Sequence, residues 1–233
     1  MSRLAIEKDP SIKMEVSEQI IQKAYEMYVI YGIHGVTMDD IANKLGISKK
    51  TIYVHFGSKD VLVETVIKQK VQENRALFST QNSSQKDAIE LLVTHIKEVC
   101  NFFGKFNSGM LFGLEKSYPT TFNMLMDYIN GFFFKIIEKD IFQGINQGLF
   151  REEFDLKVVL YFFLKNLQAI FFIDTHLHQV CRGQQIEVKL LNHFLYGIAN
   201  PKGYELLSAR TDILKESADF NLTAKDYSLN RNI

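Results

Sequence analysis

The residues best suited to chemistry lie between positions 37 and 59, in the stretch TMDDIANKLGISKKTIYVHFGSK. Residues 41–59 contain four lysines and no acidic residue, whereas the whole chain has 27 basic and 27 acidic residues and no net charge. A compact basic surface on a neutral protein is suited to binding phosphates. On charge alone, an ordinary solvated face is the alternative interpretation.

The elements that must position these residues are two short helices, 38–45 and 48–55, joined by a tight turn. Gly46 can take the positive φ that such a turn requires without steric cost. Ala42 is small at the point where the two helices must cross closely. The apolar faces that fix their angle come from Ile41, Leu45, Ile47 and Ile52. This pattern predicts a helix-turn-helix, whose second helix enters the major groove of DNA, with a bare helical hairpin as the alternative.

Within this motif, seven side chains are candidates for contacts with DNA. The N-terminal half of a recognition helix faces base edges and nearby phosphates, and the N-termini of other helices suit phosphate oxygens. His55 has an alternative role in capping or packing. The candidates are Thr37, Lys49, Lys50, Thr51, Tyr53, His55 and Lys59.

The motif resembles the N-terminal signature of the TetR family of bacterial transcriptional regulators over about residues 17–70. The resemblance rests on Thr37, Ile41-Ala42, Leu45-Gly46-Ile47-Ser48, Thr51-Ile52-Tyr53, His55-Phe56 and Lys59. Lys50 departs from the pattern, because many members have Gly or another small residue there. The resemblance implies an all-α homodimer that binds double-stranded operator DNA, with three DNA-binding helices and about six ligand and dimer helices in each chain.

The domains expected are a three-helix DNA-binding domain at 1–60, a helical ligand-binding and dimerisation domain at 61–216, and a flexible tail at 217–233. Apolar periodicity predicts helices throughout and no strands. The first carries Ile20 to Tyr31. Beyond the motif, we expect helices at 59–78, 85–106, 109–116, 119–147, 155–177, 186–198 and 204–216, with a stop at 200–203.

The expected second domain is rich in Phe and Met, and aromatic side chains with a few polar groups commonly line ligand sites. For any single residue, ordinary core packing is the alternative. Because the pockets of TetR-like proteins lie among the central helices, the resemblance implies a pocket for a small apolar or aromatic ligand. Its candidate lining residues are Phe103, Phe106, Phe112, Phe122, Met126 and Phe133.

The last two long helices have wide apolar faces. Two such helices from each chain would form a four-helix interface in a homodimer. Burial inside one chain is the alternative for some of these positions. The candidate interface residues are Phe162, Phe172, Leu191, Phe194 and Leu195.

Several function classes are disfavoured. No hydrolase, nucleotide-binding or metalloprotease motif is present, so we expect no enzyme, catalytic residue or cofactor. The two cysteines and six histidines have no metal-ligand spacing, and the cysteine usage suits a reducing cytoplasm. No apolar run reaches the length of a membrane span.

The function expected is that of a repressor that releases its operator when a small ligand binds. One alternative is a DNA-binding structural or cell-division factor of the same fold without an inducer. Another is a sensory or scaffolding helical protein that no longer contacts DNA.

Overall fold

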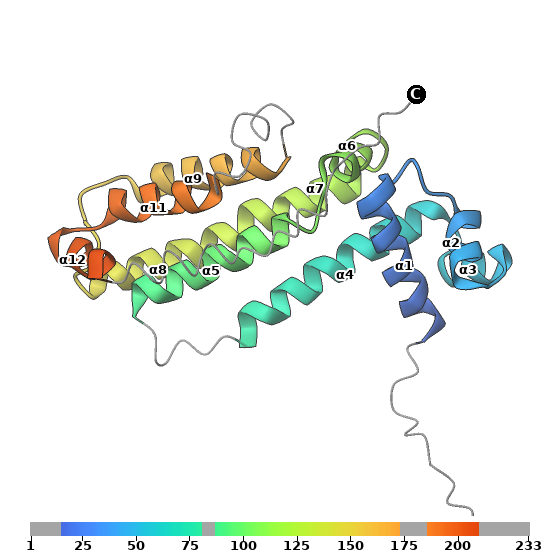
Figure 1. Cartoon of the computed structure of the whole chain (residues 1–233), viewed down its shortest axis with the longest axis horizontal. Coiled ribbons are helices and arrows are strands. Elements are labelled where there is room, and N and C mark those ends of the chain that lie inside the picture. The colour runs from blue at the N-terminus through green and yellow to red at the C-terminus, as the bar shows by residue number, and fades with distance from the viewer. Residues whose placement is uncertain (1–14, 81–86, 173–185, 210–233) are drawn as a thin grey trace, which may run out of the picture. The chain divides into compact units, whose positions relative to one another are not determined.

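The computed structural model describes residues 15–80, 87–172 and 186–209. Every regular element in these ranges is helical, which confirms the all-α prediction (Figure 1). The helices are α1 (Val16–Tyr31), α2 (Met38–Leu45), α3 (Lys49–Phe56), α4 (Lys59–Thr80), α5 (Ala88–Phe103), α6 (Ser108–Ser117), α7 (Pro119–Asp127), η2 (Tyr128–Phe133), α8 (Phe134–Asn146), α9 (Leu156–Phe172), α11 (Ile186–Ile198) and α12 (Pro201–Ala209). The expected tail at 217–233 lies outside the described residues.

The chain divides into two compact units, the first ending at Gln69 and the second beginning at Lys70. The division falls at the middle of α4, whereas the sequence predicted a boundary at 60/61. Since α4 continues from one unit into the other, the two units share one helix.

The first unit is built on the packing of α1, α2 and α3 against one another. The buried face of α1 carries Ile20, Ala24 and Tyr28, which follow the predicted helical spacing and have no exposed surface. Ile41 of α2 and Ile52 of α3 are equally buried. These contacts hold the two short helices at a fixed position in a small core.

In the second unit, α5 packs along α8, and α9 packs against both α8 and α11 (Figure 1). The predicted helix at 119–147 is interrupted by one π-helical segment, η2, between α7 and α8. This segment directs Tyr128 and Phe133 inward, where their rings contact Phe102 at centroid distances of 5.4 Å. Aromatic packing therefore fills the core beside α5.

The predicted stop at 200–203 is wrong in one respect. Helix α11 ends at Ile198, but α12 begins at Pro201, so the proline starts a helix. Proline has a fixed φ suited to the first helical position, where no hydrogen-bond donor is required. Asn200 caps this start, since its Oδ1 accepts a hydrogen bond of 3.0 Å from the amide of Gly203.

Candidate nucleic-acid interface

The turn between α2 and α3 is defined by backbone geometry. Gly46 has φ +67° and ψ +28°, the left-handed conformation that ends α2. The amide of Ile47 donates to the carbonyl of Ala42 at 3.1 Å and closes the turn. A side chain at position 46 would be strained at this φ, so glycine is the residue that suits the turn.

Both short helices begin with a side-chain cap. The hydroxyl of Thr37 accepts a hydrogen bond from the amide of Asp40 at 3.1 Å, and the Asp40 carboxylate accepts from the Thr37 amide at 2.8 Å and hydroxyl at 2.7 Å. These hydrogen bonds lower the pKa of Asp40. Ser48 caps α3 by accepting from the amide of Thr51 at 3.0 Å. Thr37 and Asp40 thus form a capping box at the start of α2.

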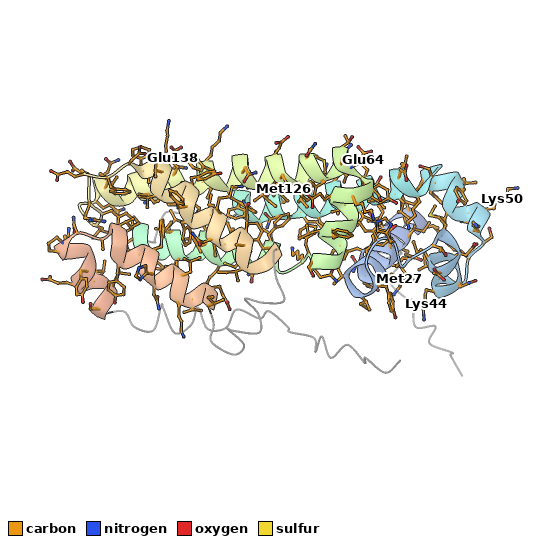
Figure 2. All side chains as sticks on the ribbon, turned by 90° about the horizontal axis from the view of Figure 1, so that it is seen from above. Met27, Lys44, Lys50, Glu64, Met126 and Glu138 are labelled. Carbon is orange, nitrogen blue, oxygen red and sulfur yellow. The ribbon has the colours of Figure 1, made fainter. Side chains whose placement is uncertain are left out.

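The inner and outer faces of α3 differ sharply. Ile52 and Phe56 are buried, whereas Lys50, Tyr53 and Val54 are exposed. Figure 2 shows Lys50 projecting away from the ribbon. The structure describes no hydrogen bond or ion pair between Lys50 and another described residue. We call the exposed residues 50, 53 and 54 the α3 outer face.

The lysines predicted to bind DNA occupy different environments. Lys49 forms an ion pair with Asp39 of α2, with Nζ and Oδ2 2.6 Å apart, and this bond raises the pKa of Lys49. Lys59 is half-buried at the start of α4, where its ammonium donates to the carbonyls of Ile33 at 2.7 Å and Val36 at 2.6 Å. Burial lowers the pKa of Lys59. Two of the predicted cations therefore also hold the unit together.

The remaining predicted residues lie near the same helix. Thr37 and Thr51 have their hydroxyls engaged at the two caps, with Thr51 Oγ1 2.8 Å from Ser48 Oγ. His55 is exposed, and its ring lies 6.2 Å from that of Phe56. Val54 lies outside the predicted contact set, although its place four residues after Lys50 puts both on one helix face.

Comparison with known proteins agrees with this geometry. The family model described as bacterial regulatory proteins, tetR family, matches residues 20–66, which span α1 to the first part of α4. Over these residues, the chain is similar to the bacterial regulatory proteins of the tetR family.

The relatives and solved structures extend the comparison. An uncharacterised HTH-type transcriptional regulator of Bacillus subtilis, YvaF, is 30% identical over 34% of this chain and 43% of its own length. The HTH-type transcriptional activator FasR of Mycolicibacterium smegmatis is 34% identical over 29% of this chain and 33% of its own length. The aligned segments thus cover less than half of either relative.

A crystal structure of a putative transcriptional regulator from Saccharomonospora viridis in complex with choline has a TM-score of 0.62 to this chain. It is 20% identical over 79% of this chain and 97% of that one. This likeness extends over both units and concerns the fold.

The six candidate pocket residues do not share one environment. Phe103, Phe106 and Phe133 are buried, with the rings of Phe103 and Phe133 5.8 Å apart. Phe122 and Met126 are half-buried, and Phe112 of α6 is 61% exposed. The structure therefore places three of them in the aromatic core and leaves Phe112 largely in solvent.

Buried polar groups accompany this aromatic core. His95 Nδ1 and Asp140 Oδ2 lie 2.5 Å apart, and burial raises the pKa of Asp140. The Tyr128 hydroxyl donates to Asn74 Oδ1 at 2.6 Å, and desolvation raises the pKa of Tyr128. These pairs could not be predicted from the sequence, because their members are 45 and 54 residues apart in the chain.

The candidate interface residues also divide. Leu191, Phe194 and Leu195 of α11 are buried within the unit, and the Phe194 ring stacks on Phe163 at 3.9 Å. For these three residues, the alternative expectation of burial inside one chain is the one that the structure shows. Phe162 of α9 is 62% exposed, and the side chain of Phe172 lies outside the described residues.

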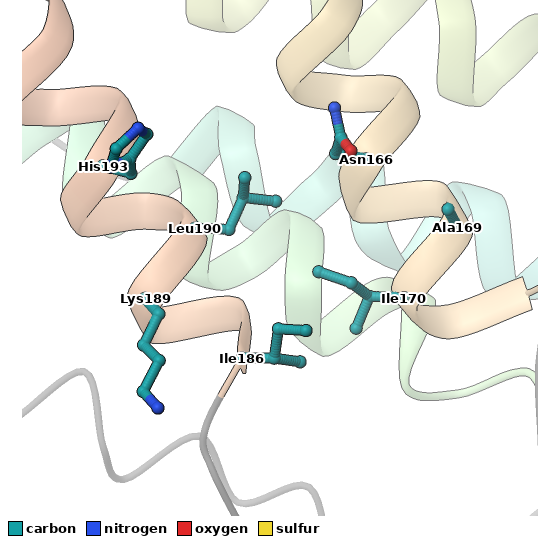
Figure 3. Close-up of a pocket in the computed structure, with 7 residues that line it drawn as sticks. All are labelled: Asn166, Ala169, Ile170, Ile186, Lys189, Leu190 and His193. Atoms are coloured by element: carbon teal, nitrogen blue, oxygen red, sulfur yellow. The ribbon is translucent and has the colours of Figure 1, made fainter. Parts of the chain in front are cut away.

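An open groove of about 430 Å³ lies between α9 and α11 (Figure 3). Ile170 and Leu190 point into the space between the two helices, and Asn166 and His193 flank it (Figure 3). None of the six candidate pocket residues lines this groove.

No described helix has the length and apolar composition needed to cross a membrane.

Proposed function

We propose that this protein is a member of the tetR family that regulates transcription by binding double-stranded operator DNA through α3. The observation that carries the proposal is the α3 outer face, which exposes a lysine, a tyrosine and a valine on a helix whose inner face is locked in the core. A helix that is packed on its inner side and exposes side chains on its outer side is suited to insertion into the major groove. The relatives named as HTH-type transcriptional regulators support the same function.

The DNA-binding residues proposed from the sequence all remain in this proposal, but they differ in how many of their hydrogen-bonding groups are available to DNA. Lys50 and Tyr53 are available to bases and phosphates as they stand. Lys49 retains two further N–H donors besides the bond to Asp39, and Lys59 retains one besides its two carbonyl bonds. Thr37, Thr51 and His55 complete the proposed contact set.

We infer that the regulator acts as a homodimer through the exposed side of α9 and α11. The support is the exposure of Phe162 and the groove lined by Asn166, Leu190 and His193, which no other described segment fills. Leu191, Phe194 and Leu195 then support the interface from inside each chain. A two-fold dimer reads two half-sites about 34–36 Å apart, which is one turn of DNA.

The proposal includes a small apolar or aromatic ligand that releases the operator, making the protein a repressor. The aromatic and buried polar side chains of the second unit support it. A second candidate is a DNA-binding structural or cell-division factor without an inducer, and the close packing of Phe103, Phe106 and Phe133 favours that candidate. Either function acts on bacterial DNA in the cytoplasm and needs no cofactor.

The test begins with selection of bound sequences from random duplexes by the full chain, followed by sequencing. A pair of inverted half-sites one helical turn apart is the expected result. Failure to enrich any sequence would overturn the proposal. Small apolar and aromatic compounds are then added to the complex to distinguish the two candidates. Release of the DNA by a compound supports the repressor. Retention of the DNA with every compound supports the structural factor.

A further inference from the structure

Val54 is a residue that folding of the first unit does not explain. Its side chain is 75% exposed, the highest fraction among the large apolar side chains in the described ranges. It lies in the last full turn of α3, a helix of eight residues. Valine is a weaker helix former than alanine because its branched Cβ restricts χ1. An exposed valine therefore gives this short helix neither core contacts nor helix propensity.

The position of Val54 makes it available to a partner of α3. It follows Lys50 by four residues, so both lie on the α3 outer face together with Tyr53. Lys50 supplies a positive charge, which phosphates and guanine acceptors attract. Val54 supplies two methyl groups and no hydrogen-bond donor or acceptor, so it can add only an apolar contact.

The major groove offers one apolar group, the C5-methyl of thymine. We propose that Val54 is a specificity-determining residue that recognises a thymine by contact with this methyl group. The inference rests on the proposed function, because it requires α3 to lie in the major groove. It goes further by assigning a base type to a residue outside the predicted contact set.

Burial of one methyl group changes a binding constant by about fourfold. Replacement of the recognised thymine by deoxyuridine, which lacks only that methyl, should thus weaken binding about fourfold. Val54→Ala removes two methyl groups and should weaken binding about tenfold. Because the side chain is exposed and alanine favours helix, the variant should unfold at the same temperature as the wild type or a higher one.

The experiment uses the full chain and the duplex selected from random DNA, with each thymine of one half-site replaced singly by deoxyuridine. We expect one thymine at which the wild type loses affinity while Val54→Ala no longer distinguishes the two bases. Val54→Ile, which keeps the branch at Cβ and both γ-carbons, should keep the discrimination. Ile30→Ala, a change of an exposed aliphatic residue on α1, is the matched control and should leave the thymine preference intact.

Three outcomes overturn the inference. One is an equal response of wild type and Val54→Ala to every deoxyuridine. Another is an unchanged affinity of Val54→Ala for the selected duplex, which would leave the proposed function standing. If the wild-type chain selects no sequence at all, the proposed function fails and the inference fails with it.

Discussion

Lys59 connects the start of α4 to the segment between α1 and α2. Its ammonium donates to the carbonyls of Ile33 and Val36, which lie 26 and 23 residues earlier in the chain. Lys59→Met keeps most of the aliphatic side chain but removes all of its donors, so both carbonyls lose a partner. We therefore expect this variant to destabilise the first unit.

The size of the effect follows from the two bonds. A hydrogen bond from a charged donor contributes about 1.5–3 kcal/mol when it is buried. Because Lys59 is only half-buried, water can replace part of each bond, and we expect a total loss of about 2 kcal/mol. Native-state amide hydrogen exchange measures it directly, since it reports the opening free energy of each segment. The amides of α1 and α2 should lose about 2 kcal/mol of protection while those of α5 and α8 do not change.

Lys50→Met is the matched control, since Lys50 is exposed and has no described partner. It should leave exchange protection unchanged but lower the slope of log affinity against log salt by about 0.9, the value for one lost phosphate contact. If Lys59→Met instead left protection intact and lowered that slope, Lys59 would act mainly on phosphate and the stabilising role would be refuted.

Three further predictions concern the cap, the chain–chain interface and pH. Thr37→Ala should lower the free energy of unfolding by about 1 kcal/mol in urea titrations, because α2 loses its capping hydroxyl; an unchanged midpoint would contradict this. Phe162→Asp should dissociate the dimer in sedimentation without unfolding it, whereas Phe194→Asp should unfold the second unit, since Phe194 is buried against Phe163; dissociation by Phe194→Asp of a still-folded chain would reverse the assignment of faces. Because the pKa of Asp40 is lowered in the folded chain, its carboxylate stabilises the fold above the unfolded pKa of about 3.9, and this stabilisation is lost as pH falls through the lower folded pKa. The difference in the free energy of unfolding between wild type and Asp40→Asn should therefore shrink as pH falls. A difference that stays constant with pH would rule this out.

Local features of the first unit could be predicted from the sequence. The bounds of α2 match the expected 38–45, and the Gly46 turn and the Thr37 cap are formed. These features depend on residues within a few positions of one another, so their chemistry is visible in the chain. The same reasoning failed at Pro201, because proline both follows helix ends and begins helices, and only the structure distinguishes the two roles.

Features that depend on distant residues could not be predicted. The acceptors of Lys59 and the partner of Asp140 come from other elements, and no local spacing indicates them. On α11, Leu190 and Phe194 are both large and apolar and lie four residues apart, but Phe194 is buried whereas Leu190 lines the groove, so apolar character alone does not tell which side chain is packed inside the chain. The exposure of Val54 could not be predicted either, because the spacing of apolar residues in the sequence does not show which of them lie at the surface.

The central claim is sequence-specific DNA binding by the α3 outer face. The most direct test is the affinity of the full chain for its selected duplex and for a shuffled duplex of equal composition, both at one physiological salt concentration. We predict that the selected duplex binds at least about 10³-fold more tightly, and that Lys50→Ala and Tyr53→Ala reduce this ratio. Equal affinity for the two duplexes, or a ratio unaffected by changes on α3, would contradict the account.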